Sequence, residues 1–414
     1  MANLIKYKFS DLYEMGSGIS TSKEQAGHGY PFASFSTVIN NYFLPDTLID
    51  LMDTTEEQRK ISSILEGDVL ITRTSETPDE LAMSCVALKD YPNATFSGFV
   101  KRLRPKNKKN VYPKYMAFYL RGPYFRKLIN SNTTMTLRAS FNEHIFNFMN
   151  IYLPPYEVQK QIGDLLYEIE QKININNEIN DNLQQLINQI YTQWFESYNF
   201  PDSNGFSYKQ NGGYMKSVKE FKHKIPDSFD VKPLLNICFW ETNSQPPKSN
   251  FIYEQKDGYV RFIQNRDYES DSYMTYIPKT RSLSIVNEYD ILMDKYGDAG
   301  KVRYGISGAF NVALAKIGVH EGFMLEYVRS YLSSEAIYNY LHNSCMASTR
   351  ASLNEENLKS IYISIPPKNL VLEYEEIVHK YRTKILYNLS ENRKLKQMRD
   401  NLLPLLINGQ VTID

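Results

Sequence analysis

The chain has 414 residues, enough for two to four domains, and its 42% hydrophobic and 23% charged residues exclude an intrinsically disordered protein. Its apolar runs fall short of the ~20 residues that cross a bilayer, and its three scattered cysteines exclude a disulfide framework and favour a cytoplasmic protein. Basic and acidic residues number 47 each, so the net charge does not by itself indicate a nucleic-acid partner, although a neutral chain can still carry a basic face.

Residues 1–155 are expected to form a first mixed domain of short strands and short helices. Within it, residues 67–73 (Gly-Asp-Val-Leu-Ile-Thr-Arg) predict a strand. Residues 101–109 are rich in lysine and arginine and contain no acid. A solvated surface loop is the more common meaning of such a run, and contact with DNA phosphates is the alternative.

The end of this domain carries a compact set of local signals. Residues 138–143 (Arg-Ala-Ser-Phe-Asn-Glu) contain the Ser-x-x-Glu spacing of a capping box, so a short helix is expected to begin at Ser140. Residues 151–153 then predict a brief strand. The following Pro154-Pro155 ends that strand and starts a new helix.

Residues 156–197 predict one long helix, roughly 60 Å in length at ~1.5 Å per residue. Apolar and amide side chains recur there at alternating steps of four and three, the period of a coiled-coil seam. The principal seam positions are Ile162, Leu166, Ile169, Ile173, Asn176 and Asn180.

The whole pattern then recurs, which predicts a duplicated architecture. A connecting segment with Pro, Asn and Gly turn signals (199–230) opens a second domain, residues 198–367. Residues 289–295 match the strand 67–73, and 350–355 match 138–143. Residues 363–367 match 151–155 at the same offset. The first copy is longer between the strand and the later motif, and the basic stretch 101–109 is the expected insertion.

Residues 368–414 predict a second long helix with the same period. Its seam positions are Val378, Tyr381, Ile385, Asn388, Asn392 and Leu395, and Arg399 is the one charged residue in the stripe. The simplest partner for each long helix is the other one. Antiparallel pairing would bring Asn176 and Asn180 close to Asn388 and Asn392, where buried amides fix the register at some cost in stability. The alternative is a rotated seam that uses Ile175, Ile179 and Leu186 and leaves the asparagines in solvent.

Motifs that would carry catalysis fail on inspection. Leu153-Pro154-Pro155-Tyr156 is similar to the loop with which adenine methyltransferases hold the target amine, but Leu153 cannot bond an amine. Residues 297–301 lack the spacing of a phosphate-binding loop. Neither His342 with Cys345 nor the other histidines have metal-ligand spacing. The sequence therefore predicts no catalytic residue and no metal site.

Two diverged domains, each closing with a strand, Pro-Pro and a long helix, resemble the specificity subunit of type I restriction-modification systems. Three further sequence features support this resemblance. They are Gln159 and Gln161 at the start of the first helix, residues 225–229 (Ile-Pro-Asp-Ser-Phe) opening the second domain, and residues 402–409 (Leu-Leu-Pro-Leu-Leu-Ile-Asn-Gly) near the C-terminus. The resemblance covers the whole chain. One departure is that residues 368–370 (Lys-Asn-Leu) lack the usual acidic-Gln start of the second helix.

The resemblance implies an α+β fold with two target-recognition domains whose long helices form an antiparallel coiled coil. It implies that each domain reads one half of a bipartite site in double-stranded DNA and that the helices set the spacing. Two methyltransferase subunits, which bind S-adenosylmethionine, would pack against the helices, and restriction endonuclease subunits would join them. The chain itself would hold no cofactor and span no membrane.

The candidate DNA contacts follow from the matched strands and the basic stretch. Base-reading groups are expected on the loops that follow the strands, and phosphate contacts on nearby cations. The base-reading candidates are Arg73, Thr74, Ser75, Lys295 and Tyr296. The phosphate candidates are Arg102, Arg104, Lys106, Lys108, Lys109, Lys301, Arg303 and Arg350, with Arg138 assigned either to the DNA backbone or to a salt bridge.

Two other functions are compatible with parts of the sequence. A coiled-coil scaffold that binds proteins would explain the helices but not the diverged bodies of the repeats. A modification enzyme with its own active site is opposed by the failed motifs. Assay of the chain with a cognate methyltransferase for site-specific adenine methylation separates the three hypotheses.

Overall fold

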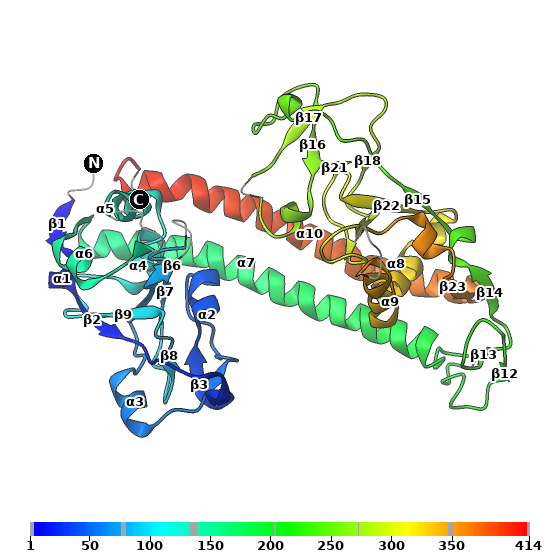
Figure 1. The fold of residues 1–414 in the computed structure, drawn as a ribbon, viewed down its shortest axis with the longest axis horizontal. Coiled ribbons are helices and arrows are strands. Elements are labelled where there is room, and N and C mark those ends of the chain that lie inside the picture. The colour runs from blue at the N-terminus through cyan, green and yellow to red at the C-terminus, as the bar shows by residue number, and fades with distance from the viewer. Residues whose placement is uncertain are drawn as a thin grey trace. The chain divides into compact units, whose positions relative to one another are not determined.

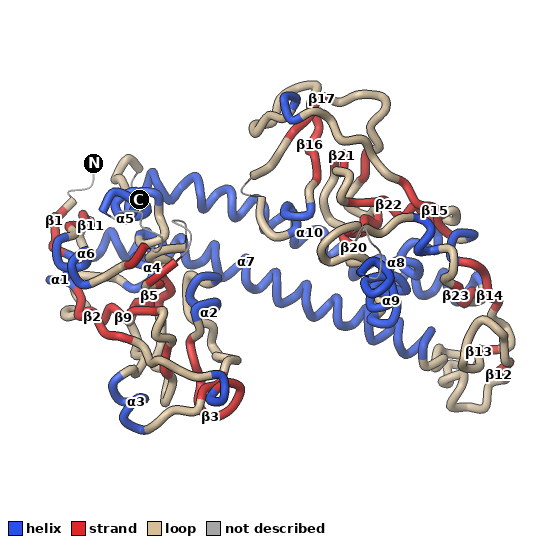
Figure 2. Tube along the Cα trace, in the orientation of Figure 1, coloured by secondary structure: helices blue, strands red, loops and turns tan. Residues whose placement is uncertain are grey.

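The computed structural model describes residues 4–75, 80–132, 139–202, 204–271, 273–346 and 352–411. It divides into two compact units. Unit 1 comprises Met1–Asn174 with Lys394–Asp414, and unit 2 comprises Ile175–Arg393. The two long helices in Figures 1 and 2, α7 (Tyr156–Tyr191) and α10 (Lys368–Ile407), each contribute a segment to both units. Both begin directly after a Pro-Pro pair, as predicted.

Unit 1 is built on a four-stranded sheet in the order β2-β9-β5-β7. Its central strand β5 is buried at every position, because Val, Leu, Ile and Thr present apolar surface to both faces. The strands of unit 1 are β1 (Ile5–Lys8), β2 (Tyr13–Ser17), β3 (Ala26–Ala33), β4 (Leu51–Met52), β5 (Val69–Thr72), β6 (Thr74–Ser75), β7 (Ser84–Val86), β8 (Thr95–Phe96), β9 (Val100–Pro105), β10 (Ala139–Ser140) and β11 (Asn150–Leu153).

Short helices pack on this sheet and connect it to the long ones. They are α1 (Phe9–Leu12), α2 (Phe35–Asn40), α3 (Glu56–Ile61), α4 (Pro113–Tyr119), α5 (Pro123–Asn132) and α6 (Glu143–Phe148). The main core joins α4 to the first turns of α7 through Ile162 and Leu166, and to the end of α10 through Leu403 and Leu406. The recognition body and the helix segments of unit 1 therefore share one core.

Unit 2 repeats this plan with a sheet in the order β15-β22-β19-β20 and a second sheet in the order β17-β16-β21-β18. Its strands are β12 (Met215–Lys216), β13 (Ile225–Pro226), β14 (Asp230–Pro233), β15 (Cys238–Glu241), β16 (Tyr259–Ile263), β17 (Tyr276–Pro278), β18 (Ile285–Val286), β19 (Ile291–Asp294), β20 (Val302–Arg303), β21 (Gly308–Phe310), β22 (Leu314–Val319) and β23 (Tyr362–Ile365). Its shorter helices are α8 (Leu325–Ser333) and α9 (Glu335–Met346).

The two units follow the same chain path, which confirms the predicted duplication. The strand before Pro-Pro pairs with β1 in unit 1 and with β14 in unit 2 in the same register, with Leu153 opposite Ile5 and Ile365 opposite Asp230. Strand β5 lies between β9 and β7, as β19 lies between β22 and β20. Strands β3 and β8 are parallel, and so are their counterparts β16 and β21.

The two long helices contact each other within unit 2 through the predicted asparagines. The Asn176 amide donates to the Oδ1 of Asn392 (2.8 Å), and the Asn388 amide donates to the Oδ1 of Asn180 (2.9 Å). As the residue number rises along α7 it falls along α10, so the segments are antiparallel. All four asparagines are buried. The rotated seam is wrong, because Ile175 and Leu186 are 48% and 42% exposed.

Within unit 1 the same two helices meet through an ion pair instead of amides. Arg399, the charged residue in the predicted stripe, donates to the Oε2 of Glu170 on α7 (2.7 Å). Its guanidinium also lies 5.0 Å from the ring centroid of Tyr42. Both charged side chains are more than four-fifths buried, so Arg399 is tolerated in the stripe because Glu170 compensates its charge.

The predictions for the helix caps and for the connecting segment 199–230 were wrong. The helix caps are Asn142 and Asn354, not the serines two residues earlier, because Ser140 is already paired in β10 and the asparagine oxygens reach the first free amides. The segment 199–230 contains the hairpin β12–β13.

The basic stretch 101–109 is not the extra segment of the first copy. Its first five residues belong to β9, the counterpart of β22. The added length lies mainly in the connection from β5 to β9, because residues 74–98 in unit 1 correspond to 296–312 in unit 2.

Candidate nucleic-acid interface

In each unit a cationic residue directly follows the central strand, and its backbone amide and backbone carbonyl both form hydrogen bonds. In unit 1 the amide of Arg73 donates to the carbonyl of Phe99 (2.7 Å). The carbonyl of Arg73 accepts from the amide of Phe141 (2.7 Å), which belongs to the repeated Arg-Ala-Ser segment. Arg73 is therefore the first residue to leave the core after the buried strand β5, at a fixed position.

Lys295 is held in the same way in unit 2. Its amide donates to the carbonyl of Ala313 (2.9 Å), and its carbonyl accepts from the amide of Leu353 (3.0 Å). Leu353 is the residue of the second Arg-Ala-Ser segment that matches Phe141. The repeated segment thus has a definite structural role, which is to fix the backbone at the end of the central strand in each unit.

The side chains around these two points differ between the units. Beside Arg73 lies Phe99, which is 64% exposed and whose counterpart is Ala313. After Lys295 comes Tyr296, which is 47% exposed, with its ring centroid 6.0 Å from the Lys295 ammonium. Thr74, at the position of Tyr296, is half-buried. A constant frame therefore presents different side chains in the two units.

Sequence reasoning did not single out Lys101 as a site residue. Lys101 lies on β9 opposite Ile71, two residues before Arg73, and burial together with the positive charge of Arg73 lowers the pKa of its ammonium. Its Nζ donates to the Oγ of Ser17 (2.7 Å). Only the pairing of β5 with β9 brings Arg73 and Lys101 together, so the linear sequence gave no signal for this pair.

Three arginines expected to contact phosphates are committed to partners inside the protein. Arg104 donates through Nε and Nη2 to the buried carboxylate of Asp68 (2.8 and 2.6 Å). Arg102 donates to the carbonyl of Ser63 (2.7 Å). Arg303 is paired in the same manner with the buried carboxylate of Asp294 (2.8 Å). These groups stabilise the sheets and are not part of the candidate interface.

The lysines expected to contact phosphates remain exposed. Lys106 donates to the carbonyl of Ser10 (2.8 Å), and Lys108 lies 3.8 Å from the carboxylate of Glu66. Lys109 is exposed, and Lys301 pairs with the exposed Asp298 (2.9 Å). Exposed pairs of this kind contribute little to stability and can exchange their partner for a phosphate.

Two predicted residues, Arg138 and Arg350, lie outside the described residues. Ser75 is placed through its backbone, which pairs with Ala139 in the β6–β10 ladder. The described residues of the two repeated segments therefore lie beside the ends of the central strands.

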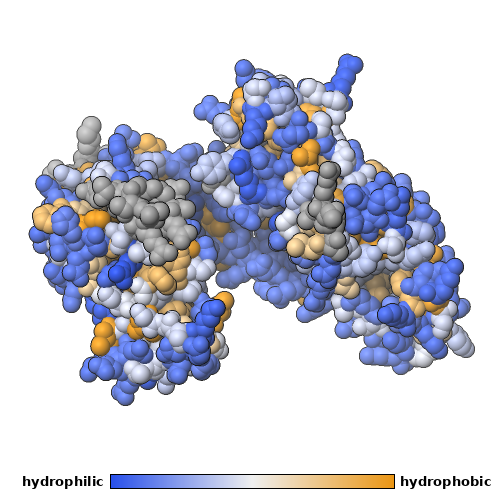
Figure 3. All heavy atoms as spheres, in the orientation of Figure 1, coloured by the Kyte–Doolittle hydropathy of each residue, from blue (hydrophilic) through white to orange (hydrophobic). Residues whose placement is uncertain are grey.

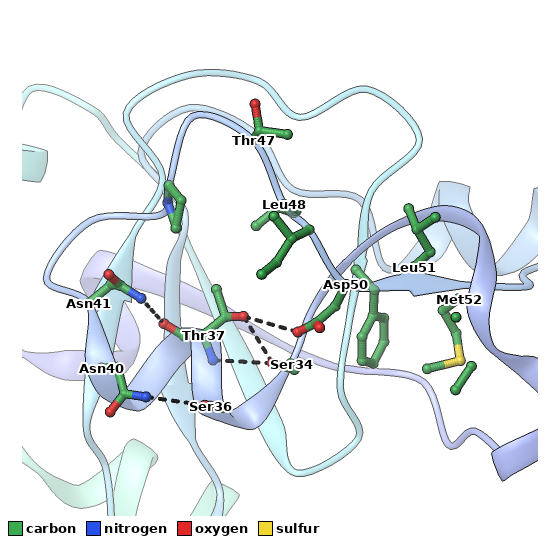
Figure 4. Close-up of a pocket in the computed structure, with 15 residues that line it drawn as sticks. Ser34, Ser36, Thr37, Asn40, Asn41, Thr47, Leu48, Asp50, Leu51 and Met52 are labelled. Carbon is green, nitrogen blue, oxygen red and sulfur yellow. Dashed lines mark hydrogen bonds between the residues drawn. The ribbon is translucent and has the colours of Figure 1, made fainter. Parts of the chain in front are cut away.

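A cavity of about 660 Å³ opens in unit 1 between α2 and the β3–β4 region. Figure 4 shows that polar groups of its lining bond to one another: Thr37 donates to Asp50 (3.5 Å), and its amide donates to Ser34 (3.2 Å). Asn40 and Asn41 also donate, to Ser36 and to the carbonyl of Thr37, and among the described residues there is no cluster of three or more potential metal ligands. The cavity therefore gives no sign of a catalytic centre.

The face in Figure 3 is mostly hydrophilic, with small apolar patches in both units. In the parts of the chain that the structure describes, no helix combines the length and apolarity that crossing a membrane requires.

Comparison with known proteins gives the family of this repeated frame. The family model described as "Type I restriction modification DNA specificity domain" matches twice, over residues 5–185 and 226–397. The chain belongs to this family. The two matches coincide with the two copies of the repeat, so each unit carries one specificity domain.

Two curated relatives agree along their whole length. The type I restriction enzyme MjaIX specificity subunit of Methanocaldococcus jannaschii is 22% identical over 98% of this chain and 93% of its own. The HindI specificity subunit of Haemophilus influenzae is 22% identical over 93% of this chain and 95% of its own. A crystal structure of the type I restriction-modification S subunit from M. genitalium has the same fold, with a TM-score of 0.60, 12% identity and coverage of 98% and 96%.

Proposed function

We propose that this type I specificity subunit reads a bipartite sequence in double-stranded DNA, one half with each unit, and brings a methyltransferase to it. The observation that supports the proposal is the repeat itself. The residue after the central strand forms the same two backbone hydrogen bonds in both units, whereas the side chains around it differ. A duplicated reader with diverged surfaces suits two different half-sites.

The proposed DNA contacts are the residues of the candidate interface other than Arg73 and Lys295. Thr74, Ser75 and Tyr296 are the base-reading candidates. Lys106, Lys108, Lys109 and Lys301 are exposed cations that would contact phosphates. Arg138 and Arg350 keep their proposed backbone or salt-bridge role on sequence grounds alone.

The chain would act without an active site of its own. Two methyltransferase subunits would bind S-adenosylmethionine and methylate adenine, and restriction endonuclease subunits would join the complex in the cytoplasm. Apolar side chains on the long helices support a docking role, because Leu372, Tyr387 and Met398 are 46%, 59% and 46% exposed.

The decisive experiment assembles the full chain with its methyltransferase subunits and maps methylated adenines on random-sequence DNA. A single two-part motif with a constant gap is expected. Methylation without sequence preference, or methylation by the isolated chain, would contradict the proposal. The protein-scaffold hypothesis predicts complexes that form but do not respond to DNA sequence.

A further inference from the structure

The strongest unexplained feature is that Arg73 and Lys295 share a structural position although their surroundings have diverged. Four backbone hydrogen bonds, two in each unit, hold them at matching points of matching sheets. The residues next to them, Phe99 in one unit and Tyr296 in the other, are not counterparts of each other. Both units therefore have a positively charged side chain on a hydrogen-bonded backbone at this position.

Neither Arg73 nor Lys295 has an acidic partner in the part of the chain that the structure describes. Among the described residues, no carboxylate lies within ion-pair distance of Arg73 or Lys295, whereas Arg104 and Arg303 each hold a buried aspartate. In unit 1 a second cation, Lys101, lies on β9 opposite Ile71, two residues before Arg73. Arg73 is exposed and Lys295 is half-buried. A charge without an acidic partner, on a fixed backbone that solvent still reaches, favours an anionic ligand.

The exchange of arginine for lysine points to the kind of group that is bound. A guanidinium reads guanine through two parallel hydrogen bonds, which the point charge of an ammonium does not reproduce. A phosphate accepts either cation. Readers of two different half-sites are also expected to differ more than these two residues do.

We propose that Arg73 and Lys295 are matched DNA-backbone anchors, each contacting a phosphate at the half-site of its own unit. Half-site choice then lies with the diverged neighbours. This inference rests on the proposed DNA-reading function and replaces the base-reading role expected for these two residues from the sequence.

The test uses the full chain assembled with its methyltransferase subunits. Equilibrium binding is measured as a function of salt for three duplexes: the mapped motif, the motif with one half-site scrambled, and an unrelated sequence. Arg73→Ala and Lys295→Ala are expected to weaken binding to all three by a similar factor. Each should reduce the slope of log affinity against log salt by about 0.9, the value for one released counterion. Arg73→Lys and Lys295→Arg should restore both quantities.

Lys89→Ala is the matched control, because it removes an exposed cation of unit 1 that already pairs with Asp46 (2.8 Å). It should leave the slope unchanged. Urea unfolding checks that the variants fold, which is expected because the anchoring hydrogen bonds use only backbone atoms.

Two results would overturn the inference. One is a loss confined to the intact motif with an unchanged salt slope, which would mark a base contact. The other is unaltered binding to every duplex. A wild-type assembly with no preference for the mapped motif is a different result, since it contradicts the DNA-reading function itself.

Discussion

In each unit, one aspartate accepts a hydrogen bond from the turn that precedes the central strand. Asp68 accepts from the amide of Leu65 (2.8 Å), and its counterpart Asp290 accepts from the amide of Asn287 (2.8 Å). Each aspartate thereby fixes the turn that leads into the central strand. The cation that balances the charge differs, because Arg104 pairs with Asp68 and Lys316 lies 3.4 Å from Asp290.

One buried carboxyl group makes the stability of unit 2 depend on pH. Glu375 on α10 accepts from the amide of Tyr327 near the start of α8 (2.8 Å), and burial raises the pKa of Glu375 from 4.5 to about 7. The folded protein keeps this proton to a higher pH than the unfolded chain does. The contribution of Glu375 to stability is therefore lost as the pH rises from about 4.5 to about 7.

We expect Glu375→Gln to be more stable than the wild type at about pH 8, by about 2 kcal/mol in the free energy of unfolding, and closer to it at about pH 5. Glutamine keeps an oxygen for the Tyr327 amide but has no proton to lose. Urea unfolding of both proteins at the two pH values measures the difference.

The neighbouring Glu376→Gln is the control for this pH effect. Its exposed partner Lys380 lowers the pKa of Glu376, so its titration lies below pH 5. A Glu375→Gln effect that is the same at both pH values would contradict the assignment.

Between the long helices α7 and α10, the buried asparagines lower the stability of the protein but favour one register of the two helices. Asn388 bonds Asn180, yet the remaining Oδ1 of Asn388 and Nδ2 of Asn180 are buried without a partner among the described residues. Buried polar groups with unsatisfied atoms cost free energy. The layers therefore favour one alignment of α7 and α10 over shifted ones.

The double change Asn180→Leu with Asn388→Leu is expected to increase the free energy of unfolding by about 1–3 kcal/mol, because apolar contacts replace two incompletely bonded amides. Asn388→Leu alone should lower it by about 1–3 kcal/mol, since the Asn180 amide is left without a partner. Urea unfolding of the three proteins measures this.

Ile385→Leu, a conservative change in the same buried stripe, controls for altered packing. If the double variant proved less stable than the wild type, the amide layer would have to contribute net stability instead of register.

At the scale of the whole molecule, duplication lets the two readers change independently. Each unit carries its own sheets, its own core and its own pinned strand end. Residues in separate cores that share no partner act additively on binding. The frame can therefore stay constant while the two recognition surfaces diverge.

Phe99→Ala and Tyr296→Ala should each alter the preference for one half of the target and leave the other half and the gap unchanged. Loss of one apolar base contact costs about 1–3 kcal/mol of discrimination. Mapping of methylated sites for both variants measures it. A variant that relaxed both halves equally would show that the units do not read separately.

The sequence by itself determined the duplicated plan, the α+β class, the start of both long helices and the asparagine layers. These follow from periodicity and from repeated local signals, which a chain carries along its length, so Asn176 and Asn392 were paired correctly. Only the tertiary structure decided the surroundings of the charges, because strand register brings Arg104 to Asp68 and places Lys101 opposite Ile71, two residues before Arg73. A run of cations looks the same in sequence whether its members face a buried carboxylate or the solvent.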